Sequence, residues 1–161
     1  SALRYGRGPP YAGARATGHK EKTDHGGGPM PARTIHPEGW APALGYANGM
    51  LMPDGTLHVG GQIGWNKDKV FVEGGFIGQM EQALTNIAEI VRAAGGDVSD
   101  VGRLTWFIKD KREYLSKQRE VGEAYRRVFG KHFPAMSMLI IKDLVEDEAL
   151  IEIEATAYIS G

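Results

Sequence analysis

The clearest pattern in the chain is an apolar stripe at helical spacing between residues 75 and 94. Apolar residues recur there at steps of three and four, at Ile77, Met80, Leu84, Ile87, Val91 and Ala94. Steps of this size place side chains on one face of an α-helix, so the segment is predicted to be an amphipathic helix with that face buried. Gly95-Gly96 follow directly and are predicted to end it.

A second helix is predicted from about Lys111 to Gly130. Its inner stripe consists of Val121, Tyr125 and Val128, and Lys, Arg and Glu occupy the outer positions. A charged outer face is typical of a helix that packs one side against a core. Pro134 cannot continue a helix and marks the break after it.

Five further segments have the composition or the alternation of β-strands. They are LGYANGML at 44–51, TLHVGGQIGW at 56–65, and the segments 103–109, 138–141 and 150–159. MPDG between the first two is a turn signal, so these two are predicted to form a hairpin. The third has apolar residues on both faces, which favours a central strand. The predicted order is ββαβαββ, an α+β domain.

The last of these strands alternates strictly between two kinds of residue. One face carries Ile151, Ile153, Ala155, Ala157 and Ile159, and the other carries Glu152, Glu154, Thr156 and Tyr158. Two helices with one apolar stripe each can cover only one face of such a sheet. The other face must meet solvent or another subunit, and in the second case Trp106 or Phe107 would help to fill the contact.

Residues 1–35 differ in composition from the rest of the chain. They hold seven glycines and half of the prolines, show no sustained apolar period, and carry six Lys and Arg against Glu21 and Asp24. This composition predicts a flexible N-terminal extension, followed by one domain over residues 36–161. A linker is the simpler interpretation of the extension, and a nucleic-acid arm is the alternative.

Composition excludes several classes of function. The absence of cysteine removes disulfides, thiolate nucleophiles and zinc sites with sulfur ligands. The five histidines, at positions 19, 25, 36, 58 and 132, show no metal-binding spacing, and no GxSxG motif is present. No apolar run is long enough to span a membrane, and no secretory signal is visible, so a cytoplasmic protein without metal or other cofactor is expected. The formal charge is −1, and because residues 1–35 are basic the remainder is net acidic, which makes it a poor match for nucleic acid.

Two features can carry chemistry. Glu152 and Glu154 lie two residues apart on a strand and point the same way, which is the arrangement of a paired-carboxylate acid/base site or, more simply, of a solvated strand face. If a neighbouring subunit covers that face, at least one carboxyl should have a raised pKa. Gly60-Gly61 would let a ligand approach the backbone, and a tight strand-to-loop turn is the alternative interpretation.

These segments together resemble the RidA/YjgF family, also labelled L-PSP endoribonucleases. The resemblance runs from about His36 to Ile159. It is carried by GYANG at 45–49, GGQIGW at 60–65, QALTNIAEIVRAAGG at 82–96, DVGRLTWFIKD at 100–110, AYRRVFG at 124–130, FPAMSM at 133–138 and IEIEATA at 151–157. Their order and spacing identify the family better than any single motif does.

The resemblance implies a chorismate mutase-like fold, with one mixed sheet, two helices on one face, and three subunits that close their open faces into a barrel. The best-known members of the family hydrolyse enamines and imines such as 2-aminoacrylate, and they bind these small molecules in clefts between subunits. Carried over by motif, the cleft of this chain should include Tyr46, Gly60, Gly61, Met136 and Glu152, with Glu152 as the catalytic residue.

Met136 is the main departure from the family pattern. The deaminases carry arginine at this position, where its planar fork grips the substrate carboxylate. A thioether has no N–H donor and no charge, so a buried carboxylate would lose about 2–5 kcal/mol of binding. The segment EYLSKQREVGEAY also looks one turn longer than in typical deaminases, and Arg119, or else Arg112 or Arg126, is a candidate substitute cation.

Three functions follow from the resemblance and its departures. The first is an enamine or imine hydrolase for a substrate other than 2-aminoacrylate. The second is a non-catalytic trimer that binds a small metabolite and acts as a regulator. The third is a ribonuclease, which the acidic balance of the domain disfavours.

Overall fold

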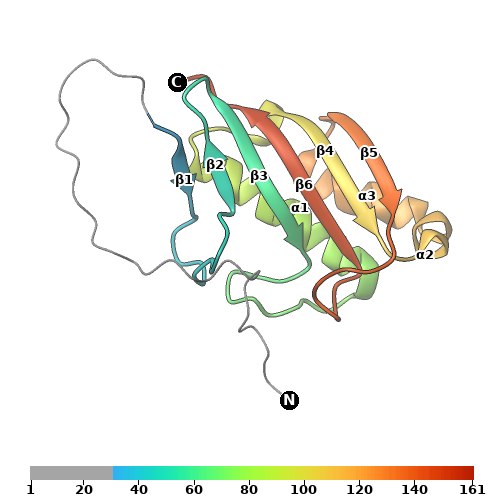
Figure 1. Cartoon of the computed structure of the whole chain (residues 1–161). Coiled ribbons are helices and arrows are strands. Elements are labelled where there is room, and N and C mark those ends of the chain that lie inside the picture. The colour runs from blue at the N-terminus through green and yellow to red at the C-terminus, as the bar shows by residue number, and fades with distance from the viewer. Residues whose placement is uncertain (1–30) are drawn as a thin grey trace, which may run out of the picture.

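The structure, a computed structural model, describes residues 31–161 and places six strands in one sheet (Figure 1). The strands are β1 (Arg33–Ile35), β2 (Gly49–Leu51), β3 (Thr56–Ile63), β4 (Val101–Ile108), β5 (Ala135–Ile140) and β6 (Ile151–Tyr158). Their order across the sheet is β1-β2-β3-β6-β4-β5. Only β4 and β5 run parallel, so the sheet is mixed, as the sequence resemblance implied.

The helices cover one face of this sheet, behind it in Figure 1. They are α1 (Gly75–Ala93), the short 3₁₀ helix η1 (Val98–Asp100), α2 (Lys111–Ser116) and α3 (Gln118–Phe129). α1 buries the predicted stripe against the inward-facing residues of β3, β4 and β6, and it ends where Gly95 adopts a φ of 92°. A left-handed residue after the last turn is the usual way for a glycine to stop a helix.

The segment predicted as one helix from Lys111 to Gly130 is broken in two. Lys117 has φ −125° and ψ 27°, outside the helical region, and separates α2 from α3. The side chain of Asp110 begins α2 by accepting hydrogen bonds from the backbone N–H groups of Arg112 and Glu113. The charged outer face showed that the segment is helical, but it contained no breaker residue that would reveal the interruption.

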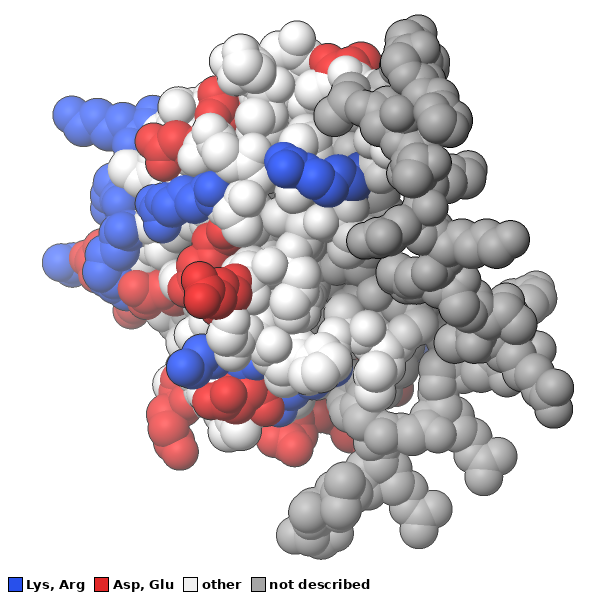
Figure 2. All heavy atoms as spheres, turned by 90° about the vertical axis from the view of Figure 1, so that its left-hand side faces the viewer, with Lys and Arg blue, Asp and Glu red and all other residues white. Residues whose placement is uncertain are grey.

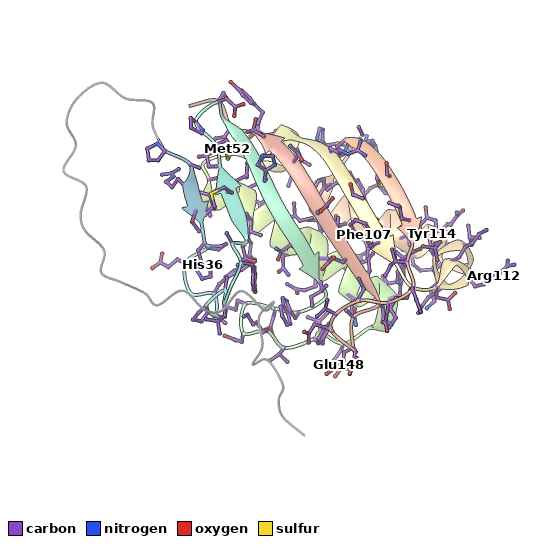
Figure 3. All side chains as sticks on the ribbon, viewed as in Figure 1. His36, Met52, Phe107, Arg112, Tyr114 and Glu148 are labelled. Carbon is purple, nitrogen blue, oxygen red and sulfur yellow. The ribbon has the colours of Figure 1, made fainter. Side chains whose placement is uncertain are left out.

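The core lies between the helices and the sheet. Ile151, Ile153, Ala155 and Ala157 are buried on the helix side, while Glu152, Glu154, Thr156 and Tyr158 lie on the other side, as their alternation predicted. The same face of the sheet continues on β4, where Phe107 is the register partner of Glu152. No described helix covers this open face, and Phe107 is labelled on it in Figure 3. Trp106 belongs instead to the core, so of the two aromatic residues only Phe107 could contact another subunit.

The strands differ from their predicted limits at several points, and β2 begins at Gly49 instead of Leu44. β1 was not predicted: Arg33–Ile35 pair with β2, and Ile35 is buried in the core, so this strand lies just before residue 36, where the domain was predicted to begin. β5 begins at Ala135, earlier than predicted. Gly60-Gly61 lie inside β3 at an irregularity between Val59 and Gln62, not in a turn at its end. The expectations for the glycine-rich residues 1–30, including His19 and His25, lie outside the described residues.

Candidate functional site

Glu152 lines a small pocket of about 200 Å³ at one end of the sheet. Its walls come from β3, from β6, from the loop before β2 and from the loop before β6. Among the lining residues are Tyr46, Gly61, Trp65 and Val145. Of the predicted cleft residues, the structure therefore brings Tyr46, Gly61 and Glu152 together within one chain.

The carboxyl group of Glu152 is half-buried against the backbone of β3. A Cβ atom added at Gly61 would lie 2.6 Å from Glu152 Cδ, so only glycine leaves room for the carboxyl group in this position. Burial, and to a smaller extent the charge of Glu154, raise the pKa of Glu152 above its ordinary value. The predicted rise in pKa is thus present within one chain, before any partner covers the face.

A buried polar chain that the sequence analysis missed holds the floor of this pocket. Gln62 Nε2 donates to Asn48 Oδ1 at 3.3 Å and to the Gly60 carbonyl at 3.0 Å, and Asn48 Nδ2 lies 3.5 Å from His36 Nδ1. The Gly60 N–H donates to the Asn48 carbonyl at 2.8 Å. The backbone amide of Gly60 therefore already has a partner within the protein, and Gly60 does not line this pocket. The sequence signal for this network was the long polar side chain of Gln62 next to the apolar Ile63 in β3.

Lys69 places a positive charge beside Tyr46 and Trp65, two residues that line this pocket. Its ammonium group lies 5.6 Å from the ring centre of Tyr46 and 5.7 Å from that of Trp65, and it donates to the Pro42 carbonyl at 2.8 Å. Contacts of this kind hold a cation over aromatic faces. Lys69 lies in a loop where no periodic pattern marks it, so sequence reasoning could not single it out.

Met136 lies away from this pocket. Its register partner on β4 is Leu104, which is fully buried on the helix side, whereas Glu152 pairs with Phe107 on the open face. Met136 and Glu152 of one chain therefore point to opposite faces of the sheet. Met136 lines a second cavity, of about 440 Å³, between α3 and β5.

The candidate substitute cations are also separated by the structure. Arg119 is largely exposed on α3, and its Nε donates to Glu123 at 3.1 Å. Arg126 lines the cavity of Met136, and Arg112 lies at a different surface on α2. The structure thus brings Arg126, and neither Arg119 nor Arg112, to the cavity of Met136.

Residues 31–161 contain neither a cluster of metal-binding side chains nor a helix that could cross a membrane. No group of three or more His, Asp or Glu side chains in this part of the chain is arranged to hold a metal ion. Of the three histidines in it, His36 and His132 bond backbone carbonyls, of Trp40 and Val101, and His58 lies exposed on β3. Within the same residues, no helix has the length and apolar composition to cross a membrane.

The fold and the Glu152 pocket together define a small α+β protein with a helix-covered sheet and an acidic site on its open face. The family described as Endoribonuclease L-PSP matches residues 38–159. The chain therefore belongs to this family, which is the RidA/YjgF family that the sequence motifs indicated.

Individual relatives agree with this assignment. The chain is 38% identical over 111 residues to the RutC family protein UK114 of Drosophila melanogaster, covering 68% of this chain and 77% of that protein. It is 33% identical over 116 residues to the 2-iminobutanoate/2-iminopropanoate deaminase of Homo sapiens, covering 71% and 81%.

Solved structures show the same fold. RidA from a Psychrobacter species has a TM-score of 0.67 and 28% identity, covering 79% of this chain and 99% of that one. TdcF of E. coli, crystallised with bound serine, has a TM-score of 0.67 and 27% identity, covering 80% and 99%.

Proposed function

We propose that this protein hydrolyses an enamine or imine other than 2-aminoacrylate, in clefts between the subunits of a homotrimer. The observation that carries this proposal is the half-buried Glu152, whose pKa is raised in a pocket it shares with Tyr46. A carboxylate whose pKa is shifted towards neutral pH is a better proton acceptor than an ordinary one. The relatives named as imine deaminases support the same reaction class.

The proposed reaction uses Glu152 twice. As a carboxylate it takes a proton from a water molecule, whose oxygen attacks the carbon of the C=N bond. The protonated Glu152 then gives this proton to nitrogen, which completes a carbinolamine. Glu152 next takes the proton of the new hydroxyl group and passes it to nitrogen, so that the C–N bond breaks, the C=O bond forms and ammonia leaves. The sum is imine plus water to ketone plus ammonia, and Glu152 returns to its starting state.

Three observations support a cleft shared between chains. The Glu152 pocket, at about 200 Å³, is smaller than the range of roughly 300–1,000 Å³ that is usual for ligand pockets. Because Met136 points to the opposite face of the sheet, it can join Glu152 in one cleft only if it comes from a second chain. The uncovered face also exposes Leu139 and Tyr158, which a neighbouring subunit would bury.

Met136 argues against a substrate that carries a carboxylate next to this residue. Its thioether offers no N–H group and no charge, so a carboxylate placed beside it would lack the partner that arginine supplies in the deaminases. The proposed substrate therefore carries an apolar group at this position. A soft, polarisable side chain adapts to such groups.

Ammonia release from imines tests the proposal. An amino-acid oxidase would generate a panel of imines in situ, and the purified protein should accelerate ammonia release from at least one apolar member while leaving 2-aminoacrylate nearly unaffected. Glu152→Gln should abolish the acceleration. Glu154→Gln is the matched control, because Glu154 lies on the same strand face but does not line the pocket. No acceleration with any imine of the panel would refute the proposal.

A non-catalytic, small-molecule-binding or regulatory trimer is the second candidate. The bound serine in the TdcF structure shows that a protein of this fold holds a small polar ligand. Glu152→Gln separates the two candidates, since an enzyme would lose turnover and keep its ligand, whereas a regulator would have no turnover to lose.

Ribonuclease activity has the weakest support of the three candidate functions. The face in Figure 2 carries Lys and Arg beside Asp and Glu, without a continuous basic stripe along which RNA could lie.

A further inference from the structure

The side-chain amide of Gln62 has only one possible orientation at the floor of the Glu152 pocket. Its Nε2 lies 3.0 Å from the Gly60 carbonyl, and a backbone carbonyl can only accept a hydrogen bond. The NH₂ group must therefore be the half of the amide that faces Gly60. The same group also donates to Asn48 Oδ1 at 3.3 Å, so both of its N–H bonds are used within the protein.

The other half of this amide, Oε1, is left as an unused acceptor. It makes no hydrogen bond with any of residues 31–161. It is not sealed in the core either, because the indole nitrogen of Trp106 is the only fully buried side-chain N or O atom of these residues without a partner. Gln62 is only 3% exposed and lines the Glu152 pocket. The remaining surface of Oε1 therefore opens into that pocket, beside the acceptor oxygens of the Glu152 carboxylate.

A chain of hydrogen bonds behind the pocket fixes this orientation. It ends at His36, which directly follows β1 and is labelled in Figure 3. Since Asn48 Oδ1 accepts from Gln62, Asn48 Nδ2 is the group that faces His36 Nδ1, at 3.5 Å, and it must donate. His36 Nδ1 then carries no proton, and Nε2 donates to the Trp40 carbonyl at 3.1 Å. Because the chain ends at two backbone carbonyls, of Trp40 and Gly60, no member can reverse without setting two donors or two acceptors against each other.

The far end of this chain is held by α1. Trp40 Nε1 donates to Glu89 Oε2 at 2.9 Å, and the Trp40 ring lies edge-on to His36, with ring centres 6.5 Å apart and 79° between the planes. The middle of the chain is shielded from water, since Asn48 is 7% exposed. The orientation of the Gln62 amide is therefore set before any ligand arrives, which is the condition for a selective contact.

We propose that Gln62 is a specificity-determining residue of the Glu152 pocket, and that its amide oxygen accepts a hydrogen bond from an N–H group of the ligand. His36 and Asn48 are positioning residues, because they act through Gln62. This inference rests on the hydrolase proposed above, in which the N–H group is that of the substrate imine. The ketone product carries an oxygen in its place, and two facing acceptors repel each other, so the pocket favours substrate over product.

Benzamide and acetophenone test the acceptor, because they share a flat shape and a carbonyl group and differ only in an NH₂ group against a methyl group. In NMR titrations of the full chain, benzamide should bind about tenfold more tightly, the effect of one hydrogen bond. Gln62→Met has a similar length but no strong acceptor, and it should weaken benzamide about tenfold and leave acetophenone unchanged. Gln82→Met, the same exchange on α1 outside the pocket, should change neither.

The positioning role of His36 has a spectroscopic signature that needs no variant of Gln62. Under mildly alkaline conditions, where histidine side chains are neutral, the ring ¹⁵N signals of His36 should place the proton on Nε2. The NH₂ protons of Gln62 should exchange slowly with water, since both are bonded. Asn48→Asp keeps the acceptor for Gln62 but turns a second acceptor towards His36. This variant should retain the slow exchange and place a proton on His36 Nδ1.

Three results would each overturn the proposal: equal affinity for benzamide and acetophenone, benzamide affinity unchanged in Gln62→Met, or a wild-type His36 with its proton on Nδ1. None of these measurements requires turnover. A retained preference for benzamide without hydrolysis of any imine would therefore refute the hydrolase alone and leave Gln62 as a selective acceptor.

Discussion

The carboxyl group of Glu152 lies in the space that a side chain at residue 61 would occupy. Its position therefore depends on glycine at this residue. A methyl group at residue 61 would displace the end of the Glu152 side chain, with Cδ 2.6 Å away, rather than any backbone atom. The carboxyl group is a flexible end that can move aside. A methyl group at residue 61 should therefore move the Glu152 carboxyl group but have little effect on the stability of the fold.

Gly61→Ala should accordingly lower imine turnover by about tenfold to a hundredfold, because displacing a catalytic group by about 1 Å has effects of that size. The unfolding midpoint in urea should change little. Gly102→Ala is the matched control, since Gly102 also lies in a strand and has nothing within 4 Å of its added Cβ. Turnover in Gly61→Ala equal to that of the wild type would show that the position of the carboxyl group does not matter.

The raised pKa of Glu152 should also make the stability of the protein depend on pH. Because the folded state holds this proton more tightly than the unfolded state, with its ordinary pKa of 4.5, the Glu152 contribution to stability falls as pH rises above 4.5. Glu152→Gln should therefore have a higher Tm than the wild type near neutral pH, with the difference shrinking as pH falls towards 4.5.

Thermal unfolding between pH 4 and pH 8, followed by circular dichroism, measures this difference. Glu154→Gln should weaken the pH dependence without removing it, since burial is the larger cause of the shift and the Glu154 charge the smaller. A Tm difference that does not change with pH would contradict the assigned cause.

An element could be predicted from the sequence when it repeats an apolar pattern over several turns, and not when it depends on one or a few residues. α1 follows its apolar stripe through five turns of regular spacing, and the sequence was enough to predict it. The separation of α2 from α3 depends on the backbone of Lys117 alone, and β1 is only three residues long. Neither is long enough to repeat a period, so no pattern in the sequence could have revealed them.

α2 is the shorter helix and depends most on its N-terminal cap. The carboxylate of Asp110 accepts from the Arg112 N–H at 2.8 Å and from the Glu113 N–H at 3.4 Å. Asp110→Ala should destabilise the protein by about 0.5–2 kcal/mol in urea unfolding, which is typical for the loss of a helix cap. Asp110→Asn keeps an oxygen acceptor and should lose much less. Equal losses in the two variants would show that the cap does not stabilise α2.

The sequence motifs predicted the family and the fold, but not the face of the sheet on which each site residue lies. Met136 and Glu152 were both assigned to one cleft, and the register of β4 with β5 and β6 places them on opposite sides of the sheet. Which way each residue of β5 points depends on pairing with β4, far away in sequence. The short apolar run of β5 has no polar alternation, so the sequence does not show which of its residues face the helices.

The uncovered face should make this protein a trimer, and Phe107 lies on that face. Phe107→Glu introduces a charge opposite Glu152 on the neighbouring strand, where burial against a partner would be strongly unfavourable. We expect the wild type to sediment as a trimer and the variant to dissociate with its secondary structure intact. Leu115→Glu, an exposed apolar residue on α2, is the control and should remain trimeric. Analytical ultracentrifugation makes the comparison, and a monomeric wild type would remove the clefts on which the proposed hydrolase depends.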